Sequence, residues 1–171
     1  MRRTFAVLPA LAALLFAAVP VSAATAAPNS PWTPAPSGPW DVAAGVRCDF
    51  PVHGEPVVDE VEQHVLETYP DGRTKRVVYR GDLVVRVTNK DTGASYDADA
   101  GGRAVVDYRE DGSQFWRVRG PVLIGFAENR GTLPRGLYTV DGSYTMEIGA
   151  TGYKTLTLQH AAIDALCTHI G

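Results

Sequence analysis

Hydrophobic and polar residues alternate along most of the chain from Val57 onward, and turn residues interrupt the alternation at short intervals. In residues 83–88, for example, Leu83, Val85 and Val87 occupy every second position. Successive side chains of a β-strand lie on opposite faces, so these three are predicted to face a core. The pattern therefore predicts a β protein.

Turn residues recur between the alternating runs. Asp71-Gly72, Asp111-Gly112, Asp141-Gly142 and Gly101-Gly102 are typical of hairpin turns, while Gly81 indicates a bulge or bend. We expect an antiparallel meander of about eight or nine strands. It closes as a lipocalin-like β-barrel or stacks as a β-sandwich, and we favour the barrel because closure removes exposed strand edges.

The hydrophobic residues of the C-terminal segment 161–170 do not alternate as those of the predicted strands do. Ala162, Ile163, Leu166 and Ile170 approximate helical spacing, which predicts a short terminal helix carrying Cys167.

The N-terminal residues 1–26 are predicted to be a secretory signal peptide. Two arginines precede an apolar run over residues 5–21, and small residues follow, with cleavage expected near Ala26 or Ala27. An uncleaved membrane anchor is the alternative, but the run is shorter than the ~20 apolar residues of a span and lacks a charged stop-transfer cluster. We expect a secreted protein whose mature chain has no membrane span.

Residues 27–45 form a predicted proline-rich linker or arm, and residues 46–171 a single β domain. Five prolines fall within residues 28–39, and proline lacks the amide donor that regular structure needs. Trp32 and Trp40 are expected to hold this arm against the domain.

The charge of the chain argues against two classes of function, nucleic-acid binding and binding to a membrane surface. The chain has 171 residues, 16 basic and 19 acidic, for a formal charge of −3. This balance lacks the basic footprint of a nucleic-acid-binding protein and the polybasic patch of a membrane-surface protein.

Cys48 and Cys167 are the two cysteines of the chain. In an oxidising compartment they allow one connectivity, so we predict a disulfide that joins the start of the domain to its end. A reactive thiol or half of a metal site are the alternatives, although His169 alone among possible ligands lies near a cysteine in the sequence.

Several short motifs occur in a characteristic order. They are Cys48-Asp49-Phe50-Pro51-Val52, residues 88–95, Asp111-Gly112, Gly120-Pro121, Pro134-Arg135-Gly136-Leu137-Tyr138 and the final Cys167. Together they resemble an uncharacterised family of small secreted actinobacterial proteins over residues 46–168. The resemblance implies export, a β-rich domain and pairing of the terminal cysteines, and it implies no activity. The acidic residues 97–102 depart from the family pattern.

Three aspartates, Asp91, Asp97 and Asp99, suggest a Ca²⁺ site, with a solvated acidic turn as the alternative. The histidines are His53, His64, His160 and His169, and their spacing matches no metal site. His64 follows Glu60 and Glu62, so an acid–base group there is conceivable, but a surface ion pair is commoner. We therefore assign no metal ligand and no cofactor.

Catalytic motifs give little support to an enzyme. The Gly-x-Ser-x-Gly nucleophile motif does not occur, and no pair of carboxylates is singled out, so no catalytic residue is assigned. The basic run of Arg73, Lys75, Arg76 and Arg80 is expected on a solvated hairpin face.

Three aromatic residues have two possible roles, and no ligand-binding residue is assigned from the sequence. Phe115, Trp116 and Tyr138 could line a ligand cavity or fill the core. An inward Trp116 would cap the core, whereas an outward one beside Arg117 and Arg119 would mark a recognition surface.

Three functions remain open. The first is a non-enzymatic secreted domain that binds a small ligand, since barrel mouths are frequent pocket sites. The second is an extracellular or cell-surface interaction module that uses the proline-rich arm and strand edges. The third is a hydrolase or isomerase without a recognisable motif.

Overall fold

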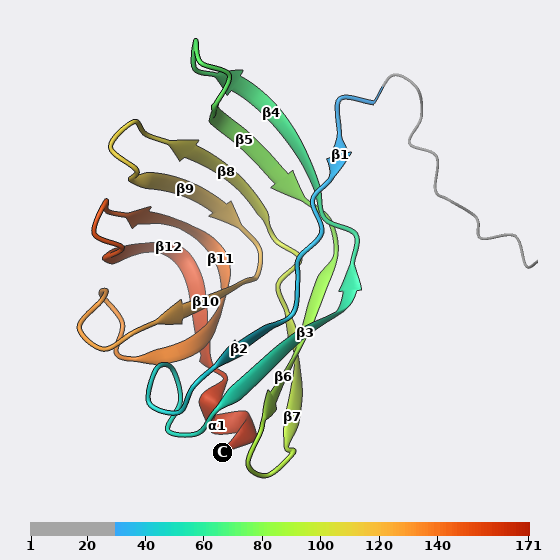
Figure 1. Cartoon of the computed structure of the whole chain (residues 1–171), viewed down its shortest axis with the longest axis vertical. Coiled ribbons are helices and arrows are strands. Elements are labelled where there is room, and N and C mark those ends of the chain that lie inside the picture. Colours follow the sequence, from blue (N-terminus) through green and yellow to red (C-terminus); the bar gives the residue numbers. More distant parts are fainter. Residues whose placement is uncertain (1–29) are drawn as a thin grey trace, which may run out of the picture.

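The computed structural model describes residues 30–171, which fold into antiparallel β-structure with one short C-terminal helix (Figure 1). The predicted signal peptide, residues 1–26, lies outside the described residues. The elements are β1 (Thr33–Pro34), β2 (Trp40–Val42), β3 (Val52–Asp59), β4 (Glu62–Thr68), β5 (Thr74–Arg80), β6 (Leu83–Asn89), β7 (Ser95–Asp99), β8 (Arg103–Tyr108), β9 (Gln114–Arg119), β10 (Val122–Phe126), β11 (Gly136–Ile148), β12 (Lys154–Ala165) and α1 (Cys167–Ile170).

The strands form two sheets. The eight-stranded sheet has the order β1-β4-β5-β8-β9-β11-β10, with β12 on the other side of β11. The four-stranded sheet has the order β2-β3-β6-β7. The predicted all-β, antiparallel class is confirmed. Residues 30–171 contain twelve strands rather than eight or nine, because bends divide the long runs and the arm adds two.

Four of the breaks between strands are bends rather than hairpin turns. At residues 60–61, 81–82 and 100–102 the chain passes from one sheet to the other, while β9 and β10, on either side of residues 120–121, pair with the two halves of β11. Backbone hydrogen bonds join neighbouring bends, as between Gly102 N and Pro121 O (2.7 Å) and between Gly120 N and Gly142 O (3.0 Å). We call this line of bends, which ends at residues 141–142, the crease.

The crease corrects two predictions. Gly101-Gly102 is predicted to form a hairpin turn, but it lies in the bend where the chain passes from β7 in one sheet to β8 in the other. Asp141-Gly142 was expected to be a turn, but both residues lie inside the continuous strand β11. Gly142 has φ +124°, and a Cβ there would overlap the carbonyl oxygen of His160 on β12. Glycine is therefore needed for close approach of two backbones. By contrast, the predicted bend at Gly81 is confirmed.

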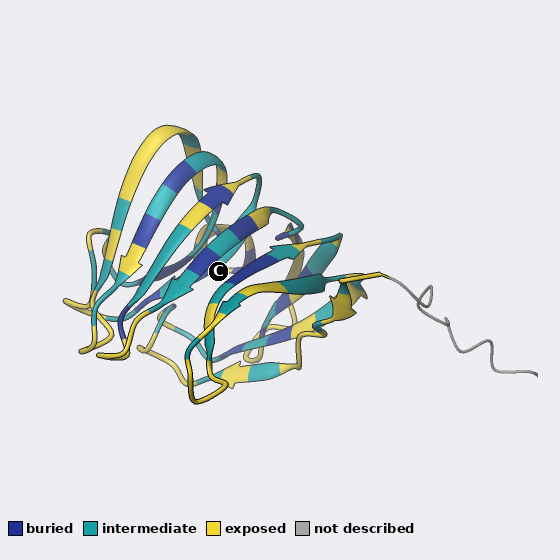
Figure 2. Cartoon of the chain, turned by 90° about the horizontal axis from the view of Figure 1, so that it is seen from above, coloured by how far each residue is buried: buried dark blue, intermediate teal, exposed yellow. Residues whose placement is uncertain are grey.

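Two hydrophobic cores lie on opposite faces of β10 and the first half of β11. Ile124 and Val140 belong to the first core, inside the bent eight-stranded sheet. Leu137 belongs to the second core, where the four-stranded sheet and α1 pack against the outer side. Val85 and Val87 are buried in this second core, and Leu83 packs against it, as predicted. Figure 2 shows buried and exposed bands alternating along the strands.

Neither sheet is closed among the described residues. β7 and β10 come into contact but are not paired, so a seam separates the two sheets there. The barrel closure favoured from the sequence is therefore not found. β7 pairs with β6 and β10 pairs with β11, so each of the two strands is left with one unpaired edge at the seam.

The C-terminal prediction is half right. Residues 161–165 continue β12 and pair with residues 138–142 of β11, and only Cys167–Ile170 are helical. Cross-strand hydrogen bonds outweigh the weak helical periodicity of this short apolar run. Over residues 30–171, no helix is long and apolar enough to cross a membrane.

The proline-rich arm lies on the domain. β1 pairs with β4 and β2 pairs with β3. The guanidinium of Arg80 lies 3.7 Å from the centre of a Trp32 ring, and the indole of Trp40 occupies the space above Gly54, where a Cβ would overlap it.

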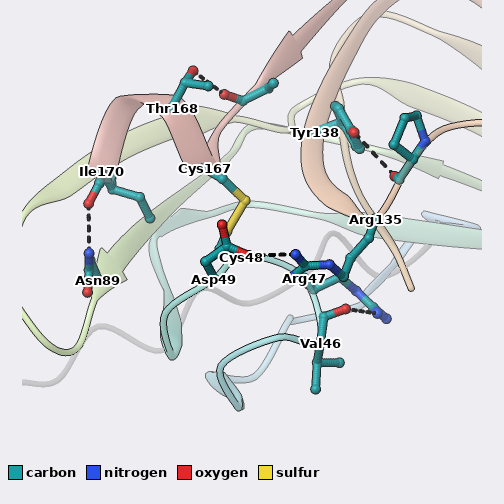
Figure 3. The surroundings of a disulfide bond; sticks show 12 residues. Val46, Arg47, Cys48, Asp49, Asn89, Arg135, Tyr138, Cys167, Thr168 and Ile170 are labelled. Carbon is teal, nitrogen blue, oxygen red and sulfur yellow. Dashed lines mark hydrogen bonds and ion pairs between the residues drawn. A yellow bond between two sulfur atoms is a disulfide. The ribbon is translucent and has the colours of Figure 1, made fainter. Parts of the chain in front are cut away.

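The predicted disulfide between Cys48 and Cys167 is confirmed (Figure 3). It joins the loop before β3 to α1, with a Cα–Cα distance of 5.6 Å. The side-chain amide of Asn89, buried at 2% exposure, donates to the Ile170 carbonyl (2.9 Å) and fixes the other end of α1. Two separate contacts therefore hold the C-terminal turn.

Candidate functional site

An apolar cleft of about 370 Å³ opens beside β10, where this strand pairs on one side with β11 and faces the arm on the other. β2 and the following loop form one wall of the cleft, and the inner face of the eight-stranded sheet forms the other. Its lining residues are Trp40, Val42, Arg47, Trp116, Val122, Leu123, Ile124, Gly125, Leu137, Met146, Ile148 and Lys154.

Two tryptophans give the cleft its aromatic walls. Trp40 is held by its contact with Gly54 on β3. Trp116 packs against the first core, and its indole N–H donates to the Gln114 side chain (2.9 Å). Both side chains are half-buried, so each leaves part of its ring for a ligand. Large aromatic surfaces of this kind bind flat or aliphatic molecules well.

Arg47 and Lys154 are the two cations of the cleft. The Arg47 side chain lies against Gly125 of β10, where a Cβ would overlap its Nε, and it donates to the Val46 carbonyl (3.0 Å). Figure 3 shows Arg47 next to Cys48, so the disulfide anchors the loop that presents it. Lys154 begins β12, with its Nζ 5.9 Å from the centre of the Phe126 ring.

Within residues 30–171, neither cation forms an ion pair with a carboxylate, whereas nine other basic residues do. Burial lowers the pKa of Lys154, and the nearby charge of Arg47 lowers it further. Burial also lowers the pKa of Arg47. A partly buried cation without a counter-charge is unfavourable, so the cleft is electrostatically suited to an anion.

The aromatic candidates separate onto two faces. Trp116 points inward and lines the cleft, while its neighbour Phe115 contacts Arg117 (4.8 Å from ring centre to guanidinium carbon) on the outer face. Tyr138 packs edge-on against Phe126 (5.9 Å between ring centres) and supports the core beside the cleft. Of the three candidates, Trp116 is thus the one in the cleft lining.

The acidic candidates do not converge. Arg86 binds both carboxylate oxygens of Asp97 (2.7 and 2.8 Å), and Asp99 accepts from the Gly101 amide (2.9 Å). Asp91 lies in the turn after Asn89. In the described part of the chain, no three histidine, cysteine, aspartate or glutamate side chains gather as a possible metal site.

The histidines occupy separate places. His53 contacts Asp41 (3.2 Å), and His64 lies edge-on to Trp32 (5.5 Å between ring centres). His169 contacts Asp164 (2.8 Å) and stacks on Tyr96. His160 is exposed on β12. Glu62, predicted near His64, contacts Arg80 instead (3.3 Å).

The basic run on the hairpin is engaged in ion pairs. Arg73 contacts Asp71, Lys75 contacts Glu67, and Arg80 contacts Glu62. Arg76 contacts both Glu67 and Asp107. This is the solvated face expected from the sequence.

The sequence did not single out Trp40, Arg47 or Lys154 as residues of a common cleft. These residues come from the arm, the loop before β3 and the start of β12, and only the folded chain brings them together. One local feature of the sequence pointed to Arg47: it directly precedes Cys48, which was predicted to form a disulfide.

Comparisons with protein-family models, with curated proteins and with solved structures find no match to this chain. The geometry of the cleft therefore carries the functional assignment.

Proposed function

We propose that this chain is a secreted, non-enzymatic binding protein for a small molecule with an apolar body and one carboxylate. The cleft beside β10 holds the ligand: Trp40 and Trp116 contact the apolar body, and Arg47 with Lys154 binds the carboxylate. The observation that carries the proposal is the pair of uncompensated, half-buried cations in an otherwise largely apolar cleft.

Three features support this assignment. The cleft volume of about 370 Å³ falls within the roughly 300–1,000 Å³ of small-molecule sites. A guanidinium suits the planar geometry of a carboxylate. The disulfide fits the export predicted from residues 1–26. Membership of the small secreted actinobacterial family remains a prediction, and the binding site proposed here lies at an open cleft rather than in a barrel interior.

The direct test uses decanoate and its uncharged analogue decanol as probes, with tryptophan fluorescence as the readout. Decanoate is expected to change the emission of Trp40 and Trp116 saturably and to bind more tightly than decanol. Arg47→Gln should weaken decanoate binding by about 10-fold to 100-fold, since a hydrogen bond to a charged group contributes about 1.5–3 kcal/mol.

Arg130→Gln is the matched control. Arg130 is exposed, has no carboxylate partner within the described residues and lies outside the cleft lining. Its substitution should leave decanoate affinity unchanged. Equal affinity for decanoate and decanol, or an Arg47→Gln variant that binds decanoate as the parent does, would refute the anionic specificity.

A further inference from the structure

A second concave surface lies on the outer face of the eight-stranded sheet, away from the cleft. It crosses β8, β9, β11 and β12, with a volume of about 450 Å³. Trp116 and Arg117 are adjacent on β9, so their side chains leave opposite faces of the sheet. We call this surface the outer groove. Its polar side chains are those of Arg103, Arg117, Arg119, Ser143, Thr145 and Gln159.

The strand register places two arginines of the outer groove directly opposite each other. Arg103 of β8 is the cross-strand partner of Arg119 on β9. Like charges in directly opposite positions destabilise a sheet. Both side chains are exposed, and neither forms an ion pair with a carboxylate of residues 30–171.

Other arginines on the same face are neutralised. Arg76 and Arg117 share Asp107, whose side chain is only 18% exposed, and Arg109 contacts Glu147 (2.6 Å). Among the described arginines of this face, Arg103 and Arg119 are therefore the two without a carboxylate partner.

Neutral hydrogen-bonding groups border these charges. Ser143 and Thr145 of β11 lie opposite Arg119 and Arg117, respectively. On β12 the register shifts between Leu158 and His160, and the extra residue at this bulge, Gln159, lines the groove. Bulges commonly redirect a side chain towards a binding site. Two hydroxyls and one amide are thus available beside the arginines.

We propose that the outer groove binds the phosphoryl group of a sugar phosphate or of another phosphorylated, hydroxyl-rich molecule. Arg103 and Arg119 bind the phosphoryl oxygens, and Ser143, Thr145 and Gln159 bind neighbouring hydroxyls. A phosphate monoester carries about −1.5 to −2 charges at pH 7, which matches the two uncompensated guanidiniums. Arginine also binds phosphate through two parallel hydrogen bonds. This site is independent of the proposed carboxylate cleft.

The test is an NMR titration of the full domain with glucose 6-phosphate, inorganic phosphate and glucose. Glucose 6-phosphate should shift the amide signals of β8 and β9 saturably and bind more tightly than inorganic phosphate, and glucose should not bind. The double variant Arg103→Gln/Arg119→Gln should bind glucose 6-phosphate at least tenfold more weakly. Its melting temperature should not fall, because the substitution removes a repulsion.

Arg130→Gln and Arg47→Gln serve as controls and should keep the parent affinity for glucose 6-phosphate. The proposal is overturned if the parent chain shows no saturable shift, if glucose binds equally well, or if the folded double variant keeps the parent affinity. Equal affinity for inorganic phosphate and glucose 6-phosphate would overturn the role of the hydroxyl-binding side chains. Failure of decanoate binding would leave this result unaffected.

Discussion

At the scale of single residues, Lys154 couples the cleft to pH. Burial and the charge of Arg47 lower its pKa below the ordinary lysine value of about 10.4. The ammonium of the free protein therefore loses its proton at a lower pH than an exposed lysine would. A bound carboxylate opposes that loss. Near the pKa of Lys154, ligand binding is therefore accompanied by protonation of this side chain.

Decanoate affinity is accordingly expected to fall as the pH rises from 7 towards 10. Fluorescence titrations across this range measure the fall. Lys154→Arg keeps its charge throughout and should flatten the profile. A parent profile that is already flat would show that Lys154 does not contact the ligand.

Asp107 forms ion pairs with two arginines of the outer face, Arg76 and Arg117. Burial raises its pKa, but the hydrogen bonds from Arg76 and Arg117 outweigh this, and the net shift is downward. A carboxyl group with a lowered folded-state pKa stabilises the fold above its unfolded-state pKa, about 3.9, and this stability is lost as the pH falls through the folded-state value.

Asp107→Asn should therefore lower the free energy of unfolding by about 1–2 kcal/mol at pH 7, and the difference from the parent should shrink in acid. Urea denaturation at several pH values measures both effects. Asp71→Asn, which removes an exposed ion pair with Arg73, is the control and should have a smaller effect. Equal losses for the two variants would contradict the assignment.

At the scale of strands, the crease decides the architecture. It passes long runs of chain from one sheet to the other. Glycines in hairpin turns and glycines at the crease have different environments: a Cβ on Gly72 would meet open space, whereas a Cβ on Gly142 would enter the neighbouring backbone.

Gly142→Ala should thus destabilise the domain more than Gly72→Ala. Both positions have positive φ, which costs an alanine about 1–2 kcal/mol, but only Gly142 adds a backbone overlap, for a total of about 3 kcal/mol or more. Chemical denaturation of the two variants gives the comparison. Similar losses would mean that β11 and β12 can separate without cost.

The same distinction explains how far the sequence could predict the strands. Alternation identified the all-β class and the inward side chains of β6, because burial on one face leaves a period of two. It could not separate Asp111-Gly112, a hairpin turn, from Asp141-Gly142, a bend within β11. Both are local Asp-Gly pairs, and the difference lies in the non-local backbone of His160.

At the scale of the whole molecule, the Cys48–Cys167 disulfide affects both the stability of the fold and the loop that carries Arg47 at the cleft. It encloses a segment with a sequence separation of 119 residues, and loop-entropy arguments give up to roughly 4–5 kcal/mol for a closure of this length. The two cysteines could be predicted to pair because no others exist. The cleft could not be predicted, since its cations and Trp40 come from distant segments.

Cys48→Ser/Cys167→Ser should lower the free energy of unfolding by several kcal/mol, within the bound given above, and weaken decanoate binding. The second effect follows because Arg47 precedes Cys48 and loses its anchor. Binding is measured at low temperature, where the variant stays folded by circular dichroism. Unchanged decanoate affinity in the folded variant would show that the loop holds Arg47 without the disulfide.

The covalent link also determines how the protein would respond to mechanical tension. Force applied between residue 30 and residue 171 would pass from Cys48 to Cys167 and bypass nearly the whole domain. With the bond intact, only the arm and the last residues could extend. The chain between Cys48 and Cys167, with a contour length of roughly 400 Å, would not be stretched. Reduction would release that length, so oxidised and reduced molecules would differ sharply in their extension under load.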